Sequence, residues 1–440
     1  MKPVVAVVGR PNVGKSTLFN ALAGERISIV EDTPGVTRDR IYAEVSWLNK
    51  NFTLIDTGGI EPESEDVILT QMREQAEIAI ETADVILFLT DVRTGLTDSD
   101  EKVCEMLRRS QKPLLLVVNK VDDFEKFMPQ VYEFYQLGIG DPIPVSGTGK
   151  LGLGDLLDEV VKFFPEETEE ETEDDRPKVA VIGKPNVGKS SLINRLTGKN
   201  RSIVSDIAGT TRDAIDSTVV FENREYVFID TAGIRRKSKI KENLERYSVI
   251  RAVTAVERAD VVVILIDALE GVTEQDAKIA GVAHDRGKGI ILAVNKWDAV
   301  EKNDQTVKEY TIEIRRVLSF LSYCEIIFLS AKSGQRVNKL FEMVDLVLAN
   351  NALRIQTGVL NEIVAEACAM KQPPSDKGRR LRIYYATQAS VKPPTFILFV
   401  NDKKLMHFSY QRYLENRLRE AFGFRGTSMR FIIRERKEEK

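Results

Sequence analysis

The stretch Gly9-Arg10-Pro11-Asn12-Val13-Gly14-Lys15-Ser16 returns later in the chain as Gly183-Lys184-Pro185-Asn186-Val187-Gly188-Lys189-Ser190. Each copy follows a short apolar run, Val4–Val8 or Val179–Ile182, and is followed by a helical pattern. A Gly-x4-Gly-Lys-Ser loop between a buried strand and a helix is the context of a P-loop. Its backbone N–H groups and the helix N-terminus bind phosphates. The sequence therefore predicts two phosphate-binding loops.

Three further motifs repeat with almost the same spacing as the two loops. Thr37-Arg38-Asp39 returns as Thr211-Arg212-Asp213, Asp56-Thr57-Gly58-Gly59 as Asp230-Thr231-Ala232-Gly233, and Asn119-Lys120-Val121-Asp122 as Asn295-Lys296-Trp297-Asp298. The offset is 174 residues for the loops and the first two motifs, and 176 for the third. Small insertions between motifs belong in loops, so a whole domain is duplicated rather than a short solenoid repeat.

Apolar runs that alternate with helical patterns indicate the fold of each copy. The runs include Val85–Leu89, Leu114–Val118, Val261–Ile266 and Ile290–Val294. Such runs are apolar on both faces and suit a mostly parallel sheet that is covered by helices. We expect an α/β fold, an open sheet with ligands at the carboxyl ends of its strands.

Composition divides the chain into four parts. Pro165–Arg176 holds eight acidic residues without apolar periodicity, which favours an extended linker over a solvated acidic helix. After Asn350 the pattern changes to short helices and strands that are broken by Pro373-Pro374 and Pro393-Pro394. The expected parts are domains 1–164 and 177–350, a linker 165–176 and a small α+β domain 351–440.

The P-loop and the Asp-x-x-Gly motif together predict binding of phosphate and magnesium. Lys15 and Lys189 are placed to reach the β- and γ-phosphates of a nucleotide. Hydroxyl and carboxylate oxygens suit Mg²⁺, which keeps several water and phosphate ligands. We expect this Mg²⁺ shell at Ser16, Asp56, Ser190 and Asp230, with backbone N–H groups of Gly59 and Gly233 on the γ-phosphate.

The third motif, Asn-Lys-x-Asp, predicts which base is bound. Asp122 and Asp298 can each accept from the N1–H and the 2-amino group of guanine. Adenine lacks this donor pair and would leave the carboxylate unpaired, a penalty that can reach ~10⁴-fold in discrimination. Ser146 and the run Ser330-Ala331-Lys332 stand where a last strand ends against the base. The set therefore predicts binding of guanine nucleotides.

These motifs together resemble the translation-factor-related GTPases and, more narrowly, the double-Era family, also called Der or EngA. The resemblance covers essentially all 440 residues, and it implies two Ras-like P-loop GTPase domains, an acidic linker and a KH-like C-terminal domain. It also implies a role in assembly of the large ribosomal subunit. Thr37 and Thr211 become switch residues that bind Mg²⁺ and sense the γ-phosphate, with Thr210 as an alternative to Thr211.

We assign nucleotide contacts to both motif sets. In the first copy these are Gly9, Arg10, Pro11, Asn12, Val13, Gly14, Lys15, Ser16, Thr17, Asp56, Thr57, Gly58, Gly59, Ile60, Asn119, Lys120, Val121, Asp122 and Ser146. In the second they are Gly183, Lys184, Pro185, Asn186, Val187, Gly188, Lys189, Ser190, Ser191, Asp230, Thr231, Ala232, Gly233, Ile234, Asn295, Lys296, Trp297, Asp298, Ser330, Ala331 and Lys332. Catalysis is expected from Asn12, Lys15, Thr37, Gly59, Asn186, Lys189, Thr211 and Gly233.

We expect the intrinsic rate of GTP hydrolysis to be slow. Ile60 and Ile234 stand where Ras-type enzymes have a glutamine that orients water. Potassium-activated relatives use the P-loop asparagine as a K⁺ ligand, and Asn12 and Asn186 match it; a loop-closing hydrogen bond is the alternative role. Arg38 and Arg212 could act as arginine fingers, although a structural or RNA role is favoured.

Charge points to a polyanionic partner. Residues 351–440 contain 18 Lys and Arg against 9 Asp and Glu, a net of +9 in a chain of net −4. Such asymmetry favours RNA contact. The second switch segment, Arg235–Lys239, is basic, whereas the first, Glu61–Asp66, is acidic. We expect large-subunit rRNA to meet the basic domain and the basic switch, with Arg379, Arg380, Arg382, Arg412, Arg417 and Arg419 as candidates. Docking of this cationic face on the second GTPase domain is the alternative.

The remaining composition excludes other classes. Cys104, Cys324 and Cys368 form no CxxC pair, which argues against zinc or a disulfide framework. No signal peptide or apolar run of ~20 residues is evident, so we expect a cytoplasmic monomer. Gly423-Phe424-Arg425-Gly426 falls between a helix and a strand and predicts a turn rather than a KH nucleotide clamp. Two alternatives remain: a tRNA-modification GTPase, and a switch or scaffold with one hydrolytically silent site.

Overall fold

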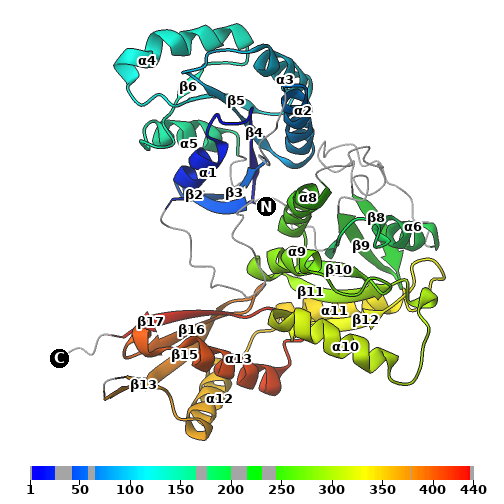
Figure 1. Ribbon diagram of the computed structural model, residues 1–440. Coiled ribbons are helices and arrows are strands. Elements are labelled where there is room, and N and C mark those ends of the chain that lie inside the picture. Colours follow the sequence, from blue (N-terminus) through cyan, green and yellow to red (C-terminus); the bar gives the residue numbers. More distant parts are fainter. Residues whose placement is uncertain are drawn as a thin grey trace. The chain divides into compact units, whose positions relative to one another are not determined.

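The computed structural model describes residues 2–24, 42–57, 65–164, 176–199, 216–229, 244–376 and 378–436. They form two compact units (Figure 1). The first comprises Met1–Asp174 together with Ser238–Glu257, and the second comprises Asp175–Lys237 together with Arg258–Lys440. The expected linker, apart from Arg176, and both switch II segments from Gly58 and from Asp230 onward lie outside the described residues, as do Thr37, Thr211, Arg38 and Arg212.

A mixed, mostly parallel sheet forms the first domain. Its strands are β1 (Val4–Val8), β2 (Tyr42–Trp47), β3 (Lys50–Asp56), β4 (Val85–Asp91), β5 (Leu114–Asn119) and β6 (Ile143–Pro144). Their order is β2-β3-β1-β4-β5-β6, and only β2 runs antiparallel to its neighbour. Strands β1 and β4 are buried along their whole length, as expected for a sheet with helices on both faces.

Helices cover both faces of this sheet (Figure 1). The helices are α1 (Lys15–Ala23), α2 (Glu65–Thr82), α3 (Asp98–Arg109), α4 (Phe124–Val131), η1 (Tyr132–Leu137) and α5 (Leu153–Lys162). Leu18 and Phe19 of α1 share one core with Leu156 and Val160 of α5. Helix α3 begins with a capping box, in which Thr97 and Asp100 satisfy each other's backbone N–H groups.

The second domain repeats this topology. Its strands are β7 (Lys178–Ile182), β8 (Ser217–Phe221), β9 (Arg224–Ile229), β10 (Val261–Asp267), β11 (Gly289–Asn295) and β12 (Glu325–Phe328), in the order β12-β11-β10-β7-β9-β8. Its helices are α6 (Lys189–Lys199), α9 (Glu274–Asp285), η2 (Trp297–Ala299), α10 (Thr306–Val317), η3 (Ser319–Leu321) and α11 (Lys339–Asn351). Helix α8 (Leu244–Arg258) lies between β9 and β10 in the sequence and, up to Glu257, belongs to the first compact unit. Helices α6 and α11 share one core, which includes Leu340, Phe341 and Val344 of α11.

The chain ends in the expected small α+β domain. Its elements are α12 (Thr357–Met370), β13 (Ser375–Asp376), β14 (Arg379–Arg380), β15 (Ile383–Ser390), β16 (Thr395–Val400), η4 (Lys403–Leu405), α13 (Phe408–Phe422) and β17 (Arg430–Glu435). Strand β16 pairs antiparallel with β15 and parallel with β17. Helices α12 and α13 pack on one face of this sheet through a core that includes Leu360, Phe396 and Leu414.

This C-terminal domain docks on the second α/β domain through the predicted turn. Gly426 is buried, donates its N–H to the Tyr323 carbonyl (2.9 Å) and accepts from Ile290 N–H (2.7 Å). Its φ is +72°, and a Cβ would lie 2.3 Å from Val347 Cγ2, so only glycine fits. Arg425 forms an ion pair with Glu325 (2.6 Å). The turn therefore serves domain docking rather than nucleotide clamping.

A histidine and an arginine complete this docked surface. His284 Nδ1 lies 2.8 Å from the Tyr323 hydroxyl, and the Arg419 guanidinium stacks 4.3 Å from the Tyr323 ring centroid. Arg419 also donates to the carbonyls of Phe424 and Thr427 (2.8 Å each). The expectation that Arg419 contacts RNA is therefore corrected, because its guanidinium already contacts Tyr323, Phe424 and Thr427 within the protein.

None of the three cysteines takes part in a disulfide bond. Cys104 and Cys324 are buried, Cys368 is partly exposed, and all three are free thiols. In the described part of the chain no helix is long and apolar enough to cross a bilayer.

The environment of His284 generates a pH prediction. Burial, followed by the charges of Arg419 and Arg430, lowers the pKa of His284 to about 4. An unfolded histidine has a pKa of about 6.5, so the unfolded state binds more protons between these values and stability falls as pH drops through that window. The ring keeps a partly exposed edge, so we expect a loss of about 1–2 kcal/mol between pH 7.5 and pH 5.

The ring signals of His284 report this directly, because the chain has only two histidines. We expect the NMR signal that disappears in a His284→Asn variant to titrate near pH 4. The pH dependence of urea unfolding should be correspondingly shallower in that variant. A His284 signal that titrates near 6.5 would contradict this account of the interface.

Candidate functional site

The first P-loop joins β1 to α1 in a conformation that requires its glycines. Gly14 has φ +92°, and a Cβ there would lie 2.5 Å from Asn119 Nδ2. A Cβ on Gly9 would lie 2.4 Å from the backbone carbonyl oxygen of Leu89. Asn12 also adopts a left-handed φ of +63° and has an exposed side chain. The loop is thus held at the carboxyl end of the sheet, where the sequence predicts phosphate binding.

The reactive side chains of the loop converge on this site. Lys15 is buried, and its Nζ donates to the carbonyl oxygens of Gly9 and Arg10 (2.7 Å each). Ser16 Oγ donates to Asp56 Oδ2 (3.0 Å), which brings the two expected Mg²⁺ ligands together. Hydroxyl and carboxylate oxygens of this kind fit Mg²⁺. No cluster of three or more His, Cys, Asp or Glu exists among the described residues, so the fit depends on phosphate and water ligands as well.

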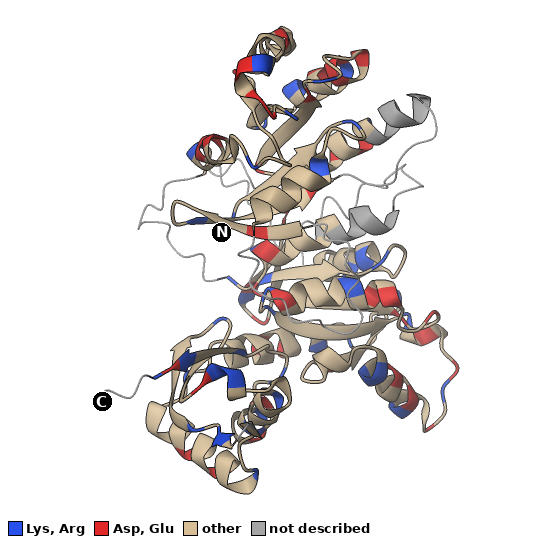
Figure 2. Cartoon of the chain, turned by 60° about the vertical axis from the view of Figure 1, so that its left-hand side comes forward, with Lys and Arg blue, Asp and Glu red and all other residues tan. Residues whose placement is uncertain are grey.

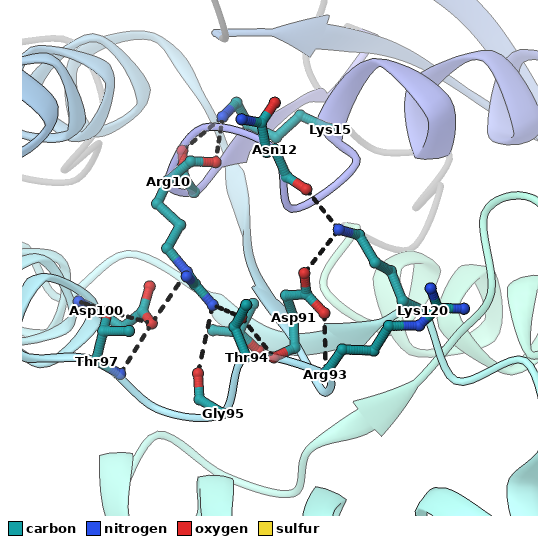
Figure 3. Close-up of polar contacts among 12 residues, drawn as sticks. Arg10, Asn12, Lys15, Asp91, Arg93, Thr94, Gly95, Thr97, Asp100 and Lys120 are labelled. Atoms are coloured by element: carbon teal, nitrogen blue, oxygen red, sulfur yellow. Dashed lines mark hydrogen bonds and ion pairs between the residues drawn. The ribbon is translucent and has the colours of Figure 1, made fainter. Parts of the chain in front are cut away.

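The Asn-Lys-x-Asp motif is hydrogen-bonded directly to the P-loop. Asn119, which ends β5, donates from Nδ2 to the Val13 carbonyl (2.8 Å) and accepts from Gly147 N–H at Oδ1 (3.0 Å). Lys120 Nζ donates to the Asn12 carbonyl (2.7 Å) and pairs with Asp91 (2.7 Å; Figure 3). The base-reading loop and the phosphate loop are therefore one hydrogen-bonded structure.

The carboxylate that is expected to read the base accepts from two side-chain donors. Ser146 Oγ donates to Asp122 Oδ1 (2.5 Å), and Arg93 Nη2 contacts Asp122 Oδ2 (2.5 Å). The Ser146 hydrogen bond, followed by Arg93, lowers the pKa of Asp122, which keeps this exposed carboxylate ionised. An ionised carboxylate that is fixed by a hydroxyl suits recognition of two adjacent N–H donors.

The loop is also tethered from its outer side (Figure 3). The Arg10 side chain leaves the phosphate site and contacts Thr94 and the Gly95 carbonyl (3.3 Å). Its Nε lies 3.4 Å from Oδ2 of Asp100, which is fully buried at the start of α3. Burial raises the pKa of Asp100, since it disfavours the charged form. Only the backbone of Arg10 faces the expected nucleotide.

The described part of the second site repeats most of these contacts, with Lys184 in place of Arg10. Lys189 Nζ donates to the carbonyls of Gly183 and Lys184 (2.7 Å each). Asn295 bridges the Val187 carbonyl (2.8 Å) and Ala331 N–H (2.9 Å). Its neighbours repeat the pattern too: Lys296 pairs with Asp267, and Lys184 with Glu270 and Asp276. A hydrogen bond from Ser330 lowers the pKa of Asp298. Two sites of the same construction are therefore present.

Several predicted contact residues can take part only through their backbone. Val13, Val187, Val121 and Trp297 have buried side chains. Trp297 packs against Tyr310 and Phe328. Other predicted residues lie outside the described part of the chain: Thr37, Gly58, Gly59, Ile60, Thr211, Asp230, Thr231, Ala232, Gly233 and Ile234.

Four carboxylates at these sites were missed by the motif analysis. Asp91 and Asp267 fix the lysine of the base motif, and Asp100 and Asp276 cap the helix that anchors the P-loop. Each pair is separated by 176 residues, the offset of the Asn-Lys-x-Asp motif. Extending the repeat comparison through this segment would have found them.

The fold, with a P-loop bonded to an Asn-Lys-x-Asp motif in each of two domains, defines the class of tandem P-loop GTPases. The family model described as 50S ribosome-binding GTPase matches residues 4–120 and again residues 178–296. A second model, the KH-domain-like C-terminal domain of EngA bacterial GTPase enzymes, matches residues 354–434. The expected fold class, two GTPase domains and a KH-like domain, is confirmed.

Similarity to named proteins extends over the full length. GTPase Der of Agathobacter rectalis is 73% identical over 437 residues, which cover 99% of each chain. GTPase Der of Acetivibrio thermocellus is 62% identical over 438 residues, which cover 100% of each. The Era protein of Aquifex aeolicus bound to GDP and AlF4⁻ is a solved structure with 22% identity; it covers 59% of this chain and 94% of its own, with a TM-score of 0.30. The chain belongs to the Der (EngA) family of GTPases, and it binds and hydrolyses GTP.

The bridging asparagine gives a test of this architecture. Asn119→Ala leaves the Val13 carbonyl and the Gly147 N–H without their partner, and each unsatisfied buried group costs about 1–3 kcal/mol. We expect guanine-nucleotide affinity at the first site to fall roughly 10- to 100-fold. The measurement is titration with fluorescent GDP in a Lys189→Ala background, which isolates the first site. Unchanged affinity would show that the bridge is dispensable.

Proposed function

We propose that this chain is a two-site, GTP-hydrolysing switch that acts in assembly of the large ribosomal subunit. The observation that carries the proposal is the asparagine bridge, which joins a P-loop to a guanine-reading loop in both domains. Full-length relatives named GTPase Der support this function over the tRNA-modification alternative. We further propose a cytoplasmic monomer with domains 1–164 and 177–350, a linker 165–176 and a C-terminal domain 351–440.

We propose the following residue roles, which the repeated motifs and the described contacts support. Asp122 and Asp298 select guanine, and the P-loop N–H groups with Lys15 or Lys189 hold the phosphates. Mg²⁺, when bound, neutralises charge between the β- and γ-phosphates. Its proposed ligands are Ser16, Asp56, Thr37, Ser190, Asp230 and Thr211. Backbone N–H groups of Gly59 and Gly233 would then contact the γ-phosphate and couple hydrolysis to the switch loops.

Phosphoryl transfer needs positioning and charge stabilisation more than covalent chemistry. Lys15 is already directed at the loop interior by two carbonyl oxygens, and it can exchange these for phosphate oxygens at little conformational cost. No glutamine follows either Asp-x-x-Gly motif, so we propose slow intrinsic turnover.

The proposed ribosome contact is made by the C-terminal domain and the second switch II. Figure 2 shows positively charged segments on the strands and helices of this domain. Arg379, Arg380, Arg382 and Arg412 are exposed, whereas Arg417 pairs with Glu420 (2.6 Å). Tyr384 and Tyr385, next to Arg382, are 38% and 44% exposed and offer surfaces on which bases can stack. The basic switch, Arg235–Lys239, is the second proposed contact.

Co-sedimentation with ribosomal subunits tests the partner. We expect selective binding to the large subunit with a non-hydrolysable GTP analogue and weaker binding with GDP. In an Arg379→Glu, Arg380→Glu variant, binding should weaken, and the slope of log affinity against log salt should fall by about 1 per lost phosphate contact. Arg316→Glu, on exposed α10, is the matched control and should bind as the wild type does. Equal binding of both variants would remove the C-terminal face from the proposal.

Potassium is the proposed activator. The Asn12 backbone carbonyl already closes the loop through Lys120, so loop closure does not need the amide. The side chains of Asn12 and Asn186 are both exposed at the same left-handed position, with φ +63°. We expect faster GTP hydrolysis in K⁺ than in Na⁺ at equal ionic strength, and equal rates in an Asn12→Ala, Asn186→Ala variant. Equal wild-type rates in the two salts would rule out the K⁺ role.

A further inference from the structure

The two guanine-reading aspartates have different neighbours. We propose that Arg93 competes with the guanine base for Asp122, so that the first site discriminates guanine less strictly than the second. The inference rests on the proposed base-reading role of Asp122 and Asp298. It assigns a specificity-determining role to a residue that lies outside every repeated motif.

Arg93 is positioned for this by the end of β4. Its backbone N–H donates to Asp91 Oδ1 (2.9 Å), and Asp91 in turn holds Lys120 of the base motif. The guanidinium then reaches Asp122 Oδ2 (2.5 Å). Since Ser146 donates to Oδ1, both oxygens that should face the base already accept from a side chain of the protein.

Guanine needs both oxygens, because its N1–H and 2-amino group donate side by side. The Ser146 hydroxyl can share Oδ1, since a carboxylate oxygen accepts more than one hydrogen bond. A guanidinium is a bulkier and charged donor, so it has to leave or tilt before the base can use Oδ2. Arg93 is 57% exposed and Asp122 41%. Exposed pairs of this kind are weak, so the competition amounts to a few-fold effect.

Among the residues that the structure describes, the second site has no equivalent competitor. Leu269 occupies the position of Arg93, at the offset of 176 residues, and its N–H donates to Asp267 in the same way (3.0 Å). Its side chain is 59% exposed and apolar. The hydrogen bond from Ser330 and, to a smaller extent, the charges of Lys332 and Lys302 lower the pKa of Asp298, but neither lysine forms an ion pair with it among the described residues. The two copies therefore provide a natural comparison at one position.

Inosine diphosphate separates this effect from general electrostatics. It carries the same phosphates as GDP but lacks the 2-amino group, so one oxygen of Asp122 stays available to Arg93. Removing Arg93 should therefore help GDP more than IDP. The ratio of the IDP to the GDP dissociation constant cancels the attraction between Arg93 and the phosphates, and it reports base reading alone.

The experiment uses the full chain with one site disabled. In a Lys189→Ala background, Arg93→Leu should raise the IDP/GDP ratio of the first site about two- to fivefold. In a Lys15→Ala background, the reciprocal Leu269→Arg should lower the ratio of the second site by a similar factor. Arg109→Leu is the matched control, since Arg109 forms an exposed ion pair with Glu105 on the same domain and should leave the ratio unchanged.

The outcomes are distinguishable from failure of the proposed function. An Asp122→Asn variant must lose GDP affinity at the first site; if it does not, the base-reading assignment itself is wrong. If Asp122→Asn loses affinity while Arg93→Leu leaves the ratio unchanged or lowers it, the competition is overturned and the base-reading role stands. If Arg93→Leu raises the IDP/GDP ratio at 0.05 M salt and raises it less at 0.5 M salt, the ion pair is supported as the cause.

Discussion

One side-chain amide holds each nucleotide site together. Asn119 and Asn295 each donate to a P-loop carbonyl and accept from the loop that follows the last strand of the motif set. Both amides are buried, so an unmade hydrogen bond cannot be replaced by water. The constraint also explains the glycine before each P-loop lysine: a Cβ there would strike the amide at 2.5 Å in the first domain and 2.3 Å in the second.

The duplication shows which contacts the architecture requires and which it only permits. The lysine-to-carbonyl contacts, the asparagine bridge and the helix capping box occur in both copies. In both copies a cationic side chain of the P-loop also pairs with the aspartate that caps the next helix. The additional partner differs: Arg10 contacts Thr94, whereas Lys184 pairs with Glu270. At the rim of the base pocket the copies diverge, with Arg93 in one and Leu269 in the other. Divergence at the rim can tune each site without disturbing its frame.

Sequence predicted the frame well because backbone chemistry dictates it. Each of three patterns, when they occur in this order along a chain, indicates one structural role. They are the P-loop glycines, a strand that is apolar on both faces and an Asn-Lys-x-Asp motif. Docking of the C-terminal domain on the second GTPase domain was open as an alternative, but its contacts were not predictable in this way. Arg419 reads as a surface cation, and only the structure shows it stacked on Tyr323, 96 residues earlier in the chain. Contacts between surface residues that are distant in the sequence leave no periodic pattern. For the same reason the contact of Arg93 with Asp122 could not be predicted from the sequence.

The central claim is that the chain holds two complete and separately built guanine-nucleotide sites. Isothermal titration of the full-length protein with GDP and Mg²⁺ measures their number directly. The account predicts two GDP molecules per wild-type chain, one for Lys15→Ala and one for Lys189→Ala, and no competition from ATP. One GDP per wild-type chain, or displacement of GDP by ATP, would contradict it.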